Sequence, residues 1–215
     1  DVYKRQGMNS ALTPWMYSKI KKGDIRSMRK VLQLLSVVVV GIAVALMLIS
    51  PELVLIFGSP KYREAVYVIP PVAASVFFIF IYNILSMPQF YYEKTQFLMV
   101  ASMAAAGANV VLNFIFIHLF GYIAAGYTTL ACYMLYSVGH YIVSKRILVN
   151  EGIQENLMSP GFLVACSVFL IGASIICNLI FPYRILRYAI LLASAGLVFW
   201  KKELLLKTMA DIRKK

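Results

Sequence analysis

Residues 95–144 read TQFLMVASMAAAGANVVLNFIFIHLFGYIAAGYTTLACYMLYSVGHYIVS and contain no Asp, Glu, Lys or Arg. A helix that crosses a lipid bilayer needs about 20 consecutive apolar residues, so this stretch is long enough for two such helices. The chain is expected to fold back near the middle of this stretch, at His118-Leu-Phe-Gly-Tyr122. The stretch therefore predicts an integral membrane protein, whose function has to be sought in what crosses or contacts a bilayer.

The composition of the whole chain agrees with this prediction. Of the 215 residues, 61% are hydrophobic and 14% are charged, and the mean hydropathy is +0.77. Soluble domains carry about 25% charged residues. The net charge of +12 could indicate a nucleic-acid partner, but the charges lie in short segments between apolar runs. That placement is typical of membrane topology signals, so we expect no nucleic-acid partner.

The uncharged runs predict an all-α integral membrane fold with six transmembrane helices in one bundle over residues 31–200. The six runs are about residues 31–57, 65–87, 95–117, 122–144, 159–181 and 185–200. The sixth run is short, and Arg184 and Arg187 lie at its start. Long basic side chains at the end of a span can reach the membrane interface, so we expect both arginines to do so.

The basic residues predict the orientation of these spans. Placing the N-terminus in the cytoplasm puts seventeen of the 21 Lys and Arg residues on the cytoplasmic side: Lys4, Arg5, Lys19, Lys21, Lys22, Arg26, Arg29, Lys30, Lys94, Lys145, Arg146, Lys201, Lys202, Lys207, Arg213, Lys214 and Lys215. The other four are Lys61, Arg63, Arg184 and Arg187. Cytoplasmic loops are enriched in Lys and Arg, so we predict a multi-pass protein with both ends of this segment in the cytoplasm.

The two ends of the chain have separate predictions. Residues 1–7 are interpreted as non-native or unassigned, because they read as unconnected to the rest of the chain. Residues 8–30 are predicted to be a cytoplasmic amphipathic segment, in which Trp15, Ile20 and Met28 alternate with basic residues and face the anionic inner leaflet. The tail of a preceding, missing span is an alternative for this segment. Residues 201–215 are predicted to form a basic cytoplasmic tail.

No pattern of catalytic, metal-binding or cofactor-binding residues is present in the sequence. None of the nine acidic residues lies in the middle of a predicted span, which argues against an ion relay in this part of the chain. Cys132, Cys166 and Cys177 lie in apolar runs and are expected to be free, buried small hydrophobes. We therefore expect no cofactor and no metal site, and no enzymatic activity.

Polar and helix-breaking residues inside the spans are the candidate functional positions. Pro70 and Pro71 are expected to kink the second span, because proline removes a backbone donor. Asn109 and Asn113 are four residues apart and so share one helix face. They, and Asn83 in the second span, require a partner on a neighbouring helix or a water-filled cavity.

The turn between the second and third spans contains Tyr91, Tyr92, Glu93 and Lys94. Tyrosine is enriched at the lipid headgroup level, and the two charges would be solvated there. A simple aromatic anchor explains this turn, and a contribution to a cavity mouth is the functional alternative. In the third span, a cluster of small residues from Ala101 to Ala108 predicts close approach of a neighbouring helix.

The order of several short motifs resembles one known family. They are Pro14-Trp15 with a basic stretch, Phe57-Gly58, Lys61-Tyr62-Arg63-Glu64-Ala65, Tyr67-Val-Ile-Pro-Pro71, Phe90-Tyr-Tyr-Glu-Lys-Thr95, Asn109-Val-Val-Leu-Asn113 and Phe120-Gly-Tyr-Ile-Ala-Ala-Gly126. Over about residues 11–145 the chain resembles the C-terminal half of polysaccharide or oligosaccharide flippases of the MATE-like (multidrug/oligosaccharidyl-lipid/polysaccharide, MOP) superfamily. The resemblance fades in the last two spans.

The resemblance implies that the chain is one lobe of a larger two-lobe transporter. The missing N-terminal half of the same chain would supply the other lobe, and a lipid-linked glycan would cross the inner (cytoplasmic) membrane between them by alternating access. Membrane lipids are the other implied partners. The implied substrate or cavity residues are Asn83, Asn109, Asn113, Tyr91, Tyr92, Glu93 and Lys94. A diphosphate favours Arg or Lys, which the missing half would supply unless Lys61, Arg63 or Lys94 line a mouth.

Two other functions are weighed against the flippase. A drug or cation antiporter of the same fold would need an acidic residue inside a span, which the missing half could supply. A polytopic enzyme of glycan assembly would need acids, histidines or arginines gathered at one membrane face. The predicted outer segments are short and their only acids are Glu52 and Glu64, which makes the enzyme the weakest of the three.

Overall fold

A computed structural model describes residues 2–200, and in that range every regular element is a helix. The helices are α1 (Val2–Lys21), α2 (Ile25–Leu48), α3 (Ser50–Phe57), the 3₁₀ helix η1 (Pro60–Tyr67), α4 (Ile69–Tyr91), α5 (Gln96–Phe120), α6 (Ala124–Asn150), α7 (Pro160–Ile180) and α8 (Arg184–Trp200). The predicted all-α class is confirmed for this range. Asp1 and the predicted basic tail 201–215 lie outside the described residues.

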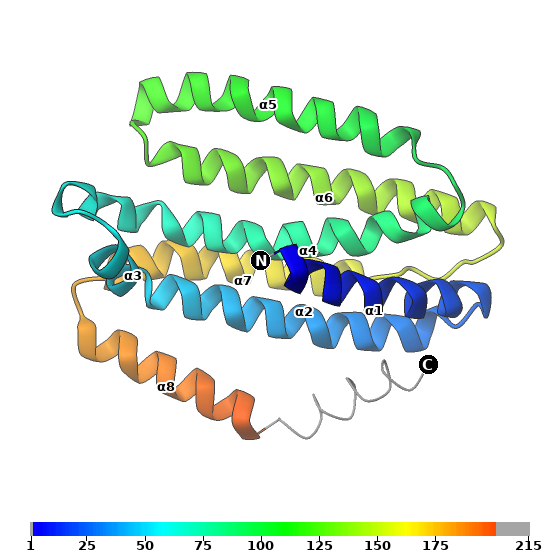
Figure 1. Ribbon diagram of the computed structural model, residues 1–215, viewed down its shortest axis with the longest axis horizontal. Helices are drawn as coiled ribbons and strands as arrows, with labels where there is room; N and C mark the ends of the chain where they lie inside the picture. Colours follow the sequence, from blue (N-terminus) through cyan, green and yellow to red (C-terminus); the bar gives the residue numbers. More distant parts are fainter. Residues whose placement is uncertain (1, 201–215) are drawn as a thin grey trace.

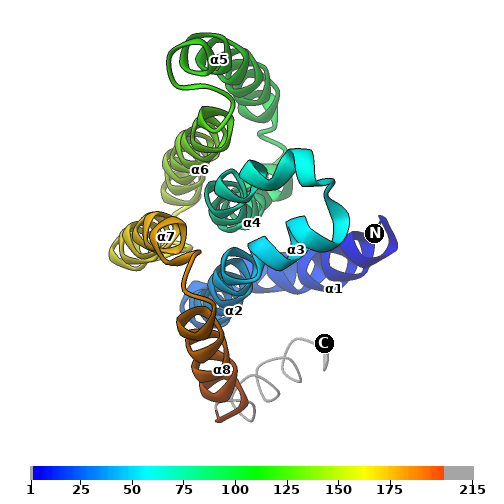
Figure 2. The same cartoon turned by 90° about the vertical axis from the view of Figure 1, so that its left-hand side faces the viewer.

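The long helices run back and forth along one axis (Figure 1). The connections that follow α1, α4 and α6 lie at one end of the bundle, and those that follow α2, α5 and α7 lie at the other. Seen along this axis, α2, α4, α6 and α7 lie next to one another, with α5 outside α6 and α8 beyond α2 (Figure 2). The most extensive helix contacts are those of α4 with α6, of α4 with α2 and of α5 with α6.

Four helical segments in the described part of the chain are long and apolar enough to cross a membrane. They are α2, residues Arg63–Tyr91 (the end of η1 with α4), α5 and α7. By length and composition, the chain is a helical membrane protein. The other two predicted spans fall in α6, which has 27 residues, and in α8, which has 17. These two helices are not among the four candidate spans, because α6 contains more polar residues and α8 is shorter.

The core of the bundle lies along α4. Phe77, Ile81, Ile84 and Leu85 of this helix are almost fully buried. They belong to one apolar cluster with side chains of α1, α2, α6 and α7. In contrast, α5 has no buried residue, because it packs extensively against α6 alone. The outer position of α5 leaves one whole helix face free of contact within the described residues.

The first predicted span, residues 31–57, is divided into two helices. α2 ends at Leu48, and α3 begins with Pro51 in its first turn. Proline has no N–H for the carbonyl four residues earlier, and its ring clashes with that carbonyl. The Ser50 hydroxyl donates to the Met47 carbonyl at 2.7 Å instead. The predicted continuation of the span through Phe57 as one helix is therefore wrong.

The kink predicted at Pro70 and Pro71 is not present. Both prolines occupy the first turn of α4, directly after η1. A missing N–H costs nothing at this position, because the first N–H groups of a helix have no partner within it. The two prolines therefore start the helix rather than bend it, and both side chains are buried.

The segment 8–30 also differs from its prediction. Trp15, Met16 and Ile20 are buried in the bundle core instead of facing lipid headgroups. The ring of Tyr17 packs edge-on against Tyr91 of α4, with 5.3 Å between the ring centroids. The chain then turns at Gly23, which has φ of +66°, and Asp24 caps the start of α2. The apolar half of this amphipathic segment thus belongs to the protein core.

Close packing at the start of α6 gives the first testable prediction. A Cβ on Gly126 would lie 2.8 Å from Pro71 Cγ and 3.0 Å from the Val68 carbonyl oxygen. Gly126→Ala is therefore expected to destabilise the protein, since overpacking costs about 1–3 kcal/mol against a helix-propensity gain of about 0.5–1 kcal/mol. The measurement is the thermal unfolding midpoint in detergent.

Gly107→Ala is the matched control for this change. A Cβ on Gly107 of α5 meets nothing within 4 Å, so this variant should unfold at or above the wild-type midpoint. Equal midpoints for the two variants would contradict the described contact between α4 and α6.

Candidate functional site

A pocket with a neutral polar lining lies between α4, α5 and α6, and is called the α5 pocket here. Its volume is about 340 Å³, and its lining residues are Tyr82, Ser102, Ala105, Ala106, Asn109, Thr129, Cys132, Tyr133 and Tyr136. None of these side chains carries a formal charge at neutral pH. Two of the three helices, α4 and α5, belong to segments long and apolar enough to cross a membrane. The pocket is therefore a polar site among apolar helices.

Aromatic rings and hydroxyl groups form one wall of the α5 pocket. Tyr82 lies parallel to Tyr133, with ring centroids 6.3 Å apart and 6° between the planes. It meets Tyr136 edge-on at 4.7 Å. The Tyr136 hydroxyl of α6 is within 2.8 Å of the Ser102 hydroxyl of α5, which links these two helices across the pocket.

The three candidate asparagines have different places in the structure. Asn109 lines the α5 pocket, and its Oδ1 accepts a hydrogen bond from Asn113 Nδ2 at 3.0 Å. Asn113 Oδ1 accepts from the Thr128 hydroxyl of α6, so this residue bridges two helices. Asn83 does not line the α5 pocket, and its Nδ2 donates to the Ile79 carbonyl of its own helix at 2.7 Å. Only Asn109 is therefore placed to meet a ligand there.

The small residues of α5 were expected to permit close approach of a neighbouring helix. In the structure α5 packs against α6, and some of these small residues also border open space. Ala105 and Ala106 line the α5 pocket. Ala101, Ala104 and Ala108 line a second pocket of about 330 Å³ between α5 and α6, on which Phe97 also borders.

A buried pair that the sequence analysis missed lies next to Tyr136. Gln89 Nε2 of α4 donates to His140 Nδ1 of α6 at 2.8 Å, and both residues are fully buried. The His140 ring lies edge-on to Tyr136 at 4.5 Å. His140 Nε2 and Gln89 Oε1 have no hydrogen-bond partner within the described part of the chain. In the sequence, Gln89 and His140 each lie near the end of a predicted span, but no sequence pattern indicates that they contact each other.

The turn residues Tyr91, Tyr92, Glu93 and Lys94 are not part of the α5 pocket. Lys94 Nζ forms an ion pair with Glu151 at 2.8 Å, which joins the turn between α4 and α5 to the end of α6. Tyr91 and Tyr92 pack edge-on at 4.8 Å, and Glu93 adopts φ of 56°. These contacts describe an anchored turn at one end of the bundle.

Ion pairing continues around the same end of the bundle. Arg26 at the start of α2 pairs with Glu155, and Arg29 Nε donates to the Asn156 carbonyl at 2.7 Å. Together with the Lys94–Glu151 pair, these contacts join the connection between α6 and α7 to both the α2 start and the α4–α5 turn.

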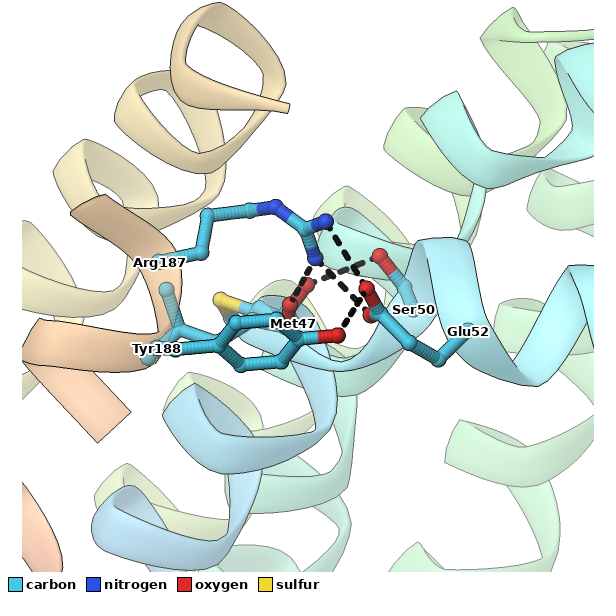
Figure 3. A network of polar contacts seen from close by, with 6 residues as sticks. Met47, Ser50, Glu52, Arg187 and Tyr188 are labelled. Carbon is cyan, nitrogen blue, oxygen red and sulfur yellow. Dashed lines mark hydrogen bonds and ion pairs between the residues drawn. The ribbon is translucent and has the colours of Figure 1, made fainter. Parts of the chain in front are cut away.

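At the opposite end of the bundle, Arg187 of α8 forms a network with α2 and α3 (Figure 3). Arg187 Nη1 donates to the Leu48 carbonyl at 2.7 Å and to Glu52 Oε2 at 2.8 Å, and Nη2 donates to Glu52 Oε1 at 2.8 Å. The Tyr188 hydroxyl donates to Glu52 Oε1 at 2.8 Å. Arg187 is 1% exposed, so its charge is paired inside the protein rather than solvated.

Local helix chemistry explains why Arg187 is held there. The Leu48 carbonyl is one of the last of α2, which have no partner within the helix, and a cation is favoured at that negative helix end. Glu52 lies in the first turn of α3, where an anion is favoured. The hydrogen bonds from Arg187 lower the pKa of Glu52 from 4.5 to about 2, against the opposing effect of burial.

No group of three or more His, Cys, Asp or Glu side chains that could hold a metal ion is present among the described residues.

Removing one partner of the buried ion pair should destabilise the protein more than removing both. Glu52→Gln leaves Arg187 buried without its counter-charge, and such breakage costs about 3–5 kcal/mol. Glu52→Gln with Arg187→Met removes both charges and is expected to cost less. Thermal unfolding midpoints in detergent at pH 7 compare the variants, with Tyr188→Phe as a control that loses one hydrogen bond. A double variant less stable than Glu52→Gln would contradict the described pairing.

The same pair predicts how stability depends on pH. Because the pKa of Glu52 is lowered on folding from 4.5 to about 2, its stabilising contribution is complete above pH 4.5 and is lost as the pH falls through about 2. The difference in midpoint between wild type and Glu52→Gln should therefore be constant from pH 7 to about pH 5.5 and narrow steadily below pH 4.5. A difference that is the same at pH 7 and pH 2.5 would contradict this assignment.

Comparisons with known proteins do not assign the chain to a family. No family model, no curated protein and no solved structure matches it.

Proposed function

We propose that this chain is the C-terminal lobe of a transporter that moves lipid-linked oligosaccharide or polysaccharide repeat units across the cytoplasmic membrane by alternating access. In this proposal α6 and α8 also cross the membrane, which gives six spans with both ends in the cytoplasm. The missing N-terminal half of the same chain supplies the second lobe. The protein binds and moves its substrate without chemical change.

The α5 pocket is the observation that carries the proposal. Its hydroxyl groups and the Asn109 amide can hydrogen-bond sugar hydroxyls, and its tyrosine rings offer flat apolar faces to a sugar ring. Polar groups between membrane-spanning helices are costly unless they meet a partner, water or a ligand. A glycan headgroup in transit would meet these polar groups while its lipid tail stays in the bilayer.

The position of α5 supports a partner lobe. This helix has no buried residue and lies at the outside of the bundle, although it carries Ser102, Asn109 and Asn113. In a two-lobe transporter the open side of the α5 pocket would face the second lobe across a cavity. The α5 surface is then left uncovered because its natural neighbour belongs to the other half.

The neutral lining favours a sugar over a cation. An antiporter for drugs or cations would need an acid in its binding site. None of the residues that line the α5 pocket is acidic. This observation favours the flippase over the antiporter for the part of the cavity that this lobe would supply.

The distribution of ion pairs supports the proposed orientation. Arg26, Arg29 and Lys94 lie at the end of the bundle where the connections after α1, α4 and α6 meet. The short basic segments predicted to face the cytoplasm thus meet at one end, as a single membrane orientation requires.

Transport by variants of the α5 pocket tests the proposal. Asn109→Leu and Tyr136→Phe each remove a hydrogen-bonding group from the pocket. Loss of such a group costs about 1–3 kcal/mol, so translocation of a fluorescent lipid-linked oligosaccharide by the full-length protein in proteoliposomes should fall about 5- to 100-fold.

Asn178→Leu is the matched control for these variants. Asn178 Nδ2 donates to the Tyr127 hydroxyl at 3.0 Å, so this change also removes a polar link between helices, but outside the α5 pocket. It should leave transport within about two-fold of wild type, since the lost bond is of ordinary strength. Equal losses in all three variants, or none in the pocket variants, would contradict the proposal.

A further inference from the structure

A further pocket, with a cationic lining, lies at the end of the bundle opposite the Lys94 turn. It is formed by α3, η1 and the start of α8, has a volume of about 520 Å³, and is called the arginine pocket here. Arg63, Arg184 and Arg187 line it, together with Glu52. Three positive charges and one negative charge thus border the same space.

The charges of the arginine pocket do not cancel. The negative charge of Glu52 is neutralised by Arg187, which donates two hydrogen bonds of 2.8 Å to its carboxylate. Arg63 and Arg184 are exposed, and neither has an acidic partner within 4 Å in the described part of the chain. The N-terminal end of α8 begins at Arg184 and adds a favourable field for an anion. The pocket therefore keeps an excess of positive charge.

Arg187, which lines the same pocket, is almost fully buried. The Arg187 side chain is 2% exposed, and its two Nη atoms are used by Glu52 and the Leu48 carbonyl. Its Nε is buried and makes no hydrogen bond to the described residues. Arg187 thus adds a positive charge to the wall of the arginine pocket, held in place by Glu52 and the Leu48 carbonyl.

The apolar part of the lining indicates what carries the anion. Val54, Leu55, Val66 and Phe181 border the arginine pocket beside the arginines. On α3, Leu55, Ile56 and Phe57 are 68%, 71% and 84% exposed, which is unusual for side chains of this kind. A bilayer would cover them, and the arginine pocket would then open at the level of the lipid headgroups.

We propose that the arginine pocket binds the phosphate group of an anionic lipid, with the exposed Arg63 and Arg184 as its cationic contacts. The apolar wall contacts the adjoining acyl chains. Arginine suits this role because its planar donors match the geometry of a phosphate. The site does not depend on glycan transport, since it would bind membrane phospholipid in any helical membrane protein with this geometry.

Lipid-induced stabilisation tests this site in the full chain. Purified protein in detergent is titrated with dioleoyl phosphatidic acid in phosphatidylcholine, with phosphatidylcholine alone, or with inorganic phosphate, and the thermal midpoint is followed. Phosphatidic acid should raise the midpoint in a saturable way, and the other two should not. Arg63→Gln and Arg184→Gln should each weaken binding and so raise the half-saturation concentration of phosphatidic acid about ten-fold.

Lys61→Gln is the matched control. Lys61 is exposed on the same 3₁₀ helix and has the same charge as Arg63, but does not line the arginine pocket. Its replacement should leave the half-saturation concentration unchanged. Arg63 and Arg184 are exposed, so in the absence of added lipid the Arg63→Gln and Arg184→Gln variants should have the wild-type thermal midpoint. An equal effect of Lys61→Gln would overturn the proposal in favour of diffuse attraction. Saturable stabilisation by inorganic phosphate alone would overturn the assignment to a lipid, and no effect of phosphatidic acid would overturn the site.

Discussion

Inside a bundle of membrane-spanning helices, a polar side chain that cannot reach water needs a partner within the protein. Several hydroxyls meet this need within their own helix: those of Ser36, Ser75 and Ser86 donate to carbonyls three or four residues earlier. Such bonds satisfy the hydrogen-bonding capacity of the serine hydroxyl but do not link one helix to another. The bonds between helices are fewer, and they decide which helices are held together and which polar groups remain for a ligand.

Three of these links organise the bundle. Asn113 with Thr128 joins α5 to α6, Gln89 with His140 joins α4 to α6, and Arg187 with Glu52 joins α8 to the α2–α3 corner. α5 and α8 are the two outermost helices of the bundle in Figure 2. Each of them is therefore fixed by a polar link in addition to apolar packing. The α5 pocket, lined by neutral groups, lies beside α5, and the arginine pocket lies beside α8.

The sequence predicted those features that depend on local composition. Apolar runs located the long helices, and the Gly121 region was expected to turn the chain between α5 and α6, where Gly121 has φ of +76°. The prolines were misread because the same residue breaks a helix interior and begins a helix, and only the position of the boundary separates the two. Trp15 and Ile20 were misread because an amphipathic helix looks alike whether its apolar face meets lipid or protein.

Contacts between distant residues could not be predicted from the sequence. Asn83, Asn109 and Asn113 look equivalent along the chain, yet one bonds its own helix, one bridges two helices and one lines the α5 pocket. Arg187 and Glu52 are 135 residues apart, and no periodicity relates them. The α5 pocket and the arginine pocket are each formed by three elements that meet in space. Their lining residues could therefore be found only from the structure.

Water accessibility along α5 tests the central claim, that the α5 pocket belongs to a water-filled cavity. Single cysteines replace Ser102, Ala106 or Asn109 in a background without Cys132, Cys166 and Cys177, and membrane vesicles are treated with a membrane-impermeant thiol reagent. Met103, Val111 and Phe114 are exposed but do not line the pocket, and they serve as controls. Fast labelling at the three pocket positions and slow labelling at the controls is the predicted result. Equal labelling at all six positions, or none at the pocket positions, would contradict the account.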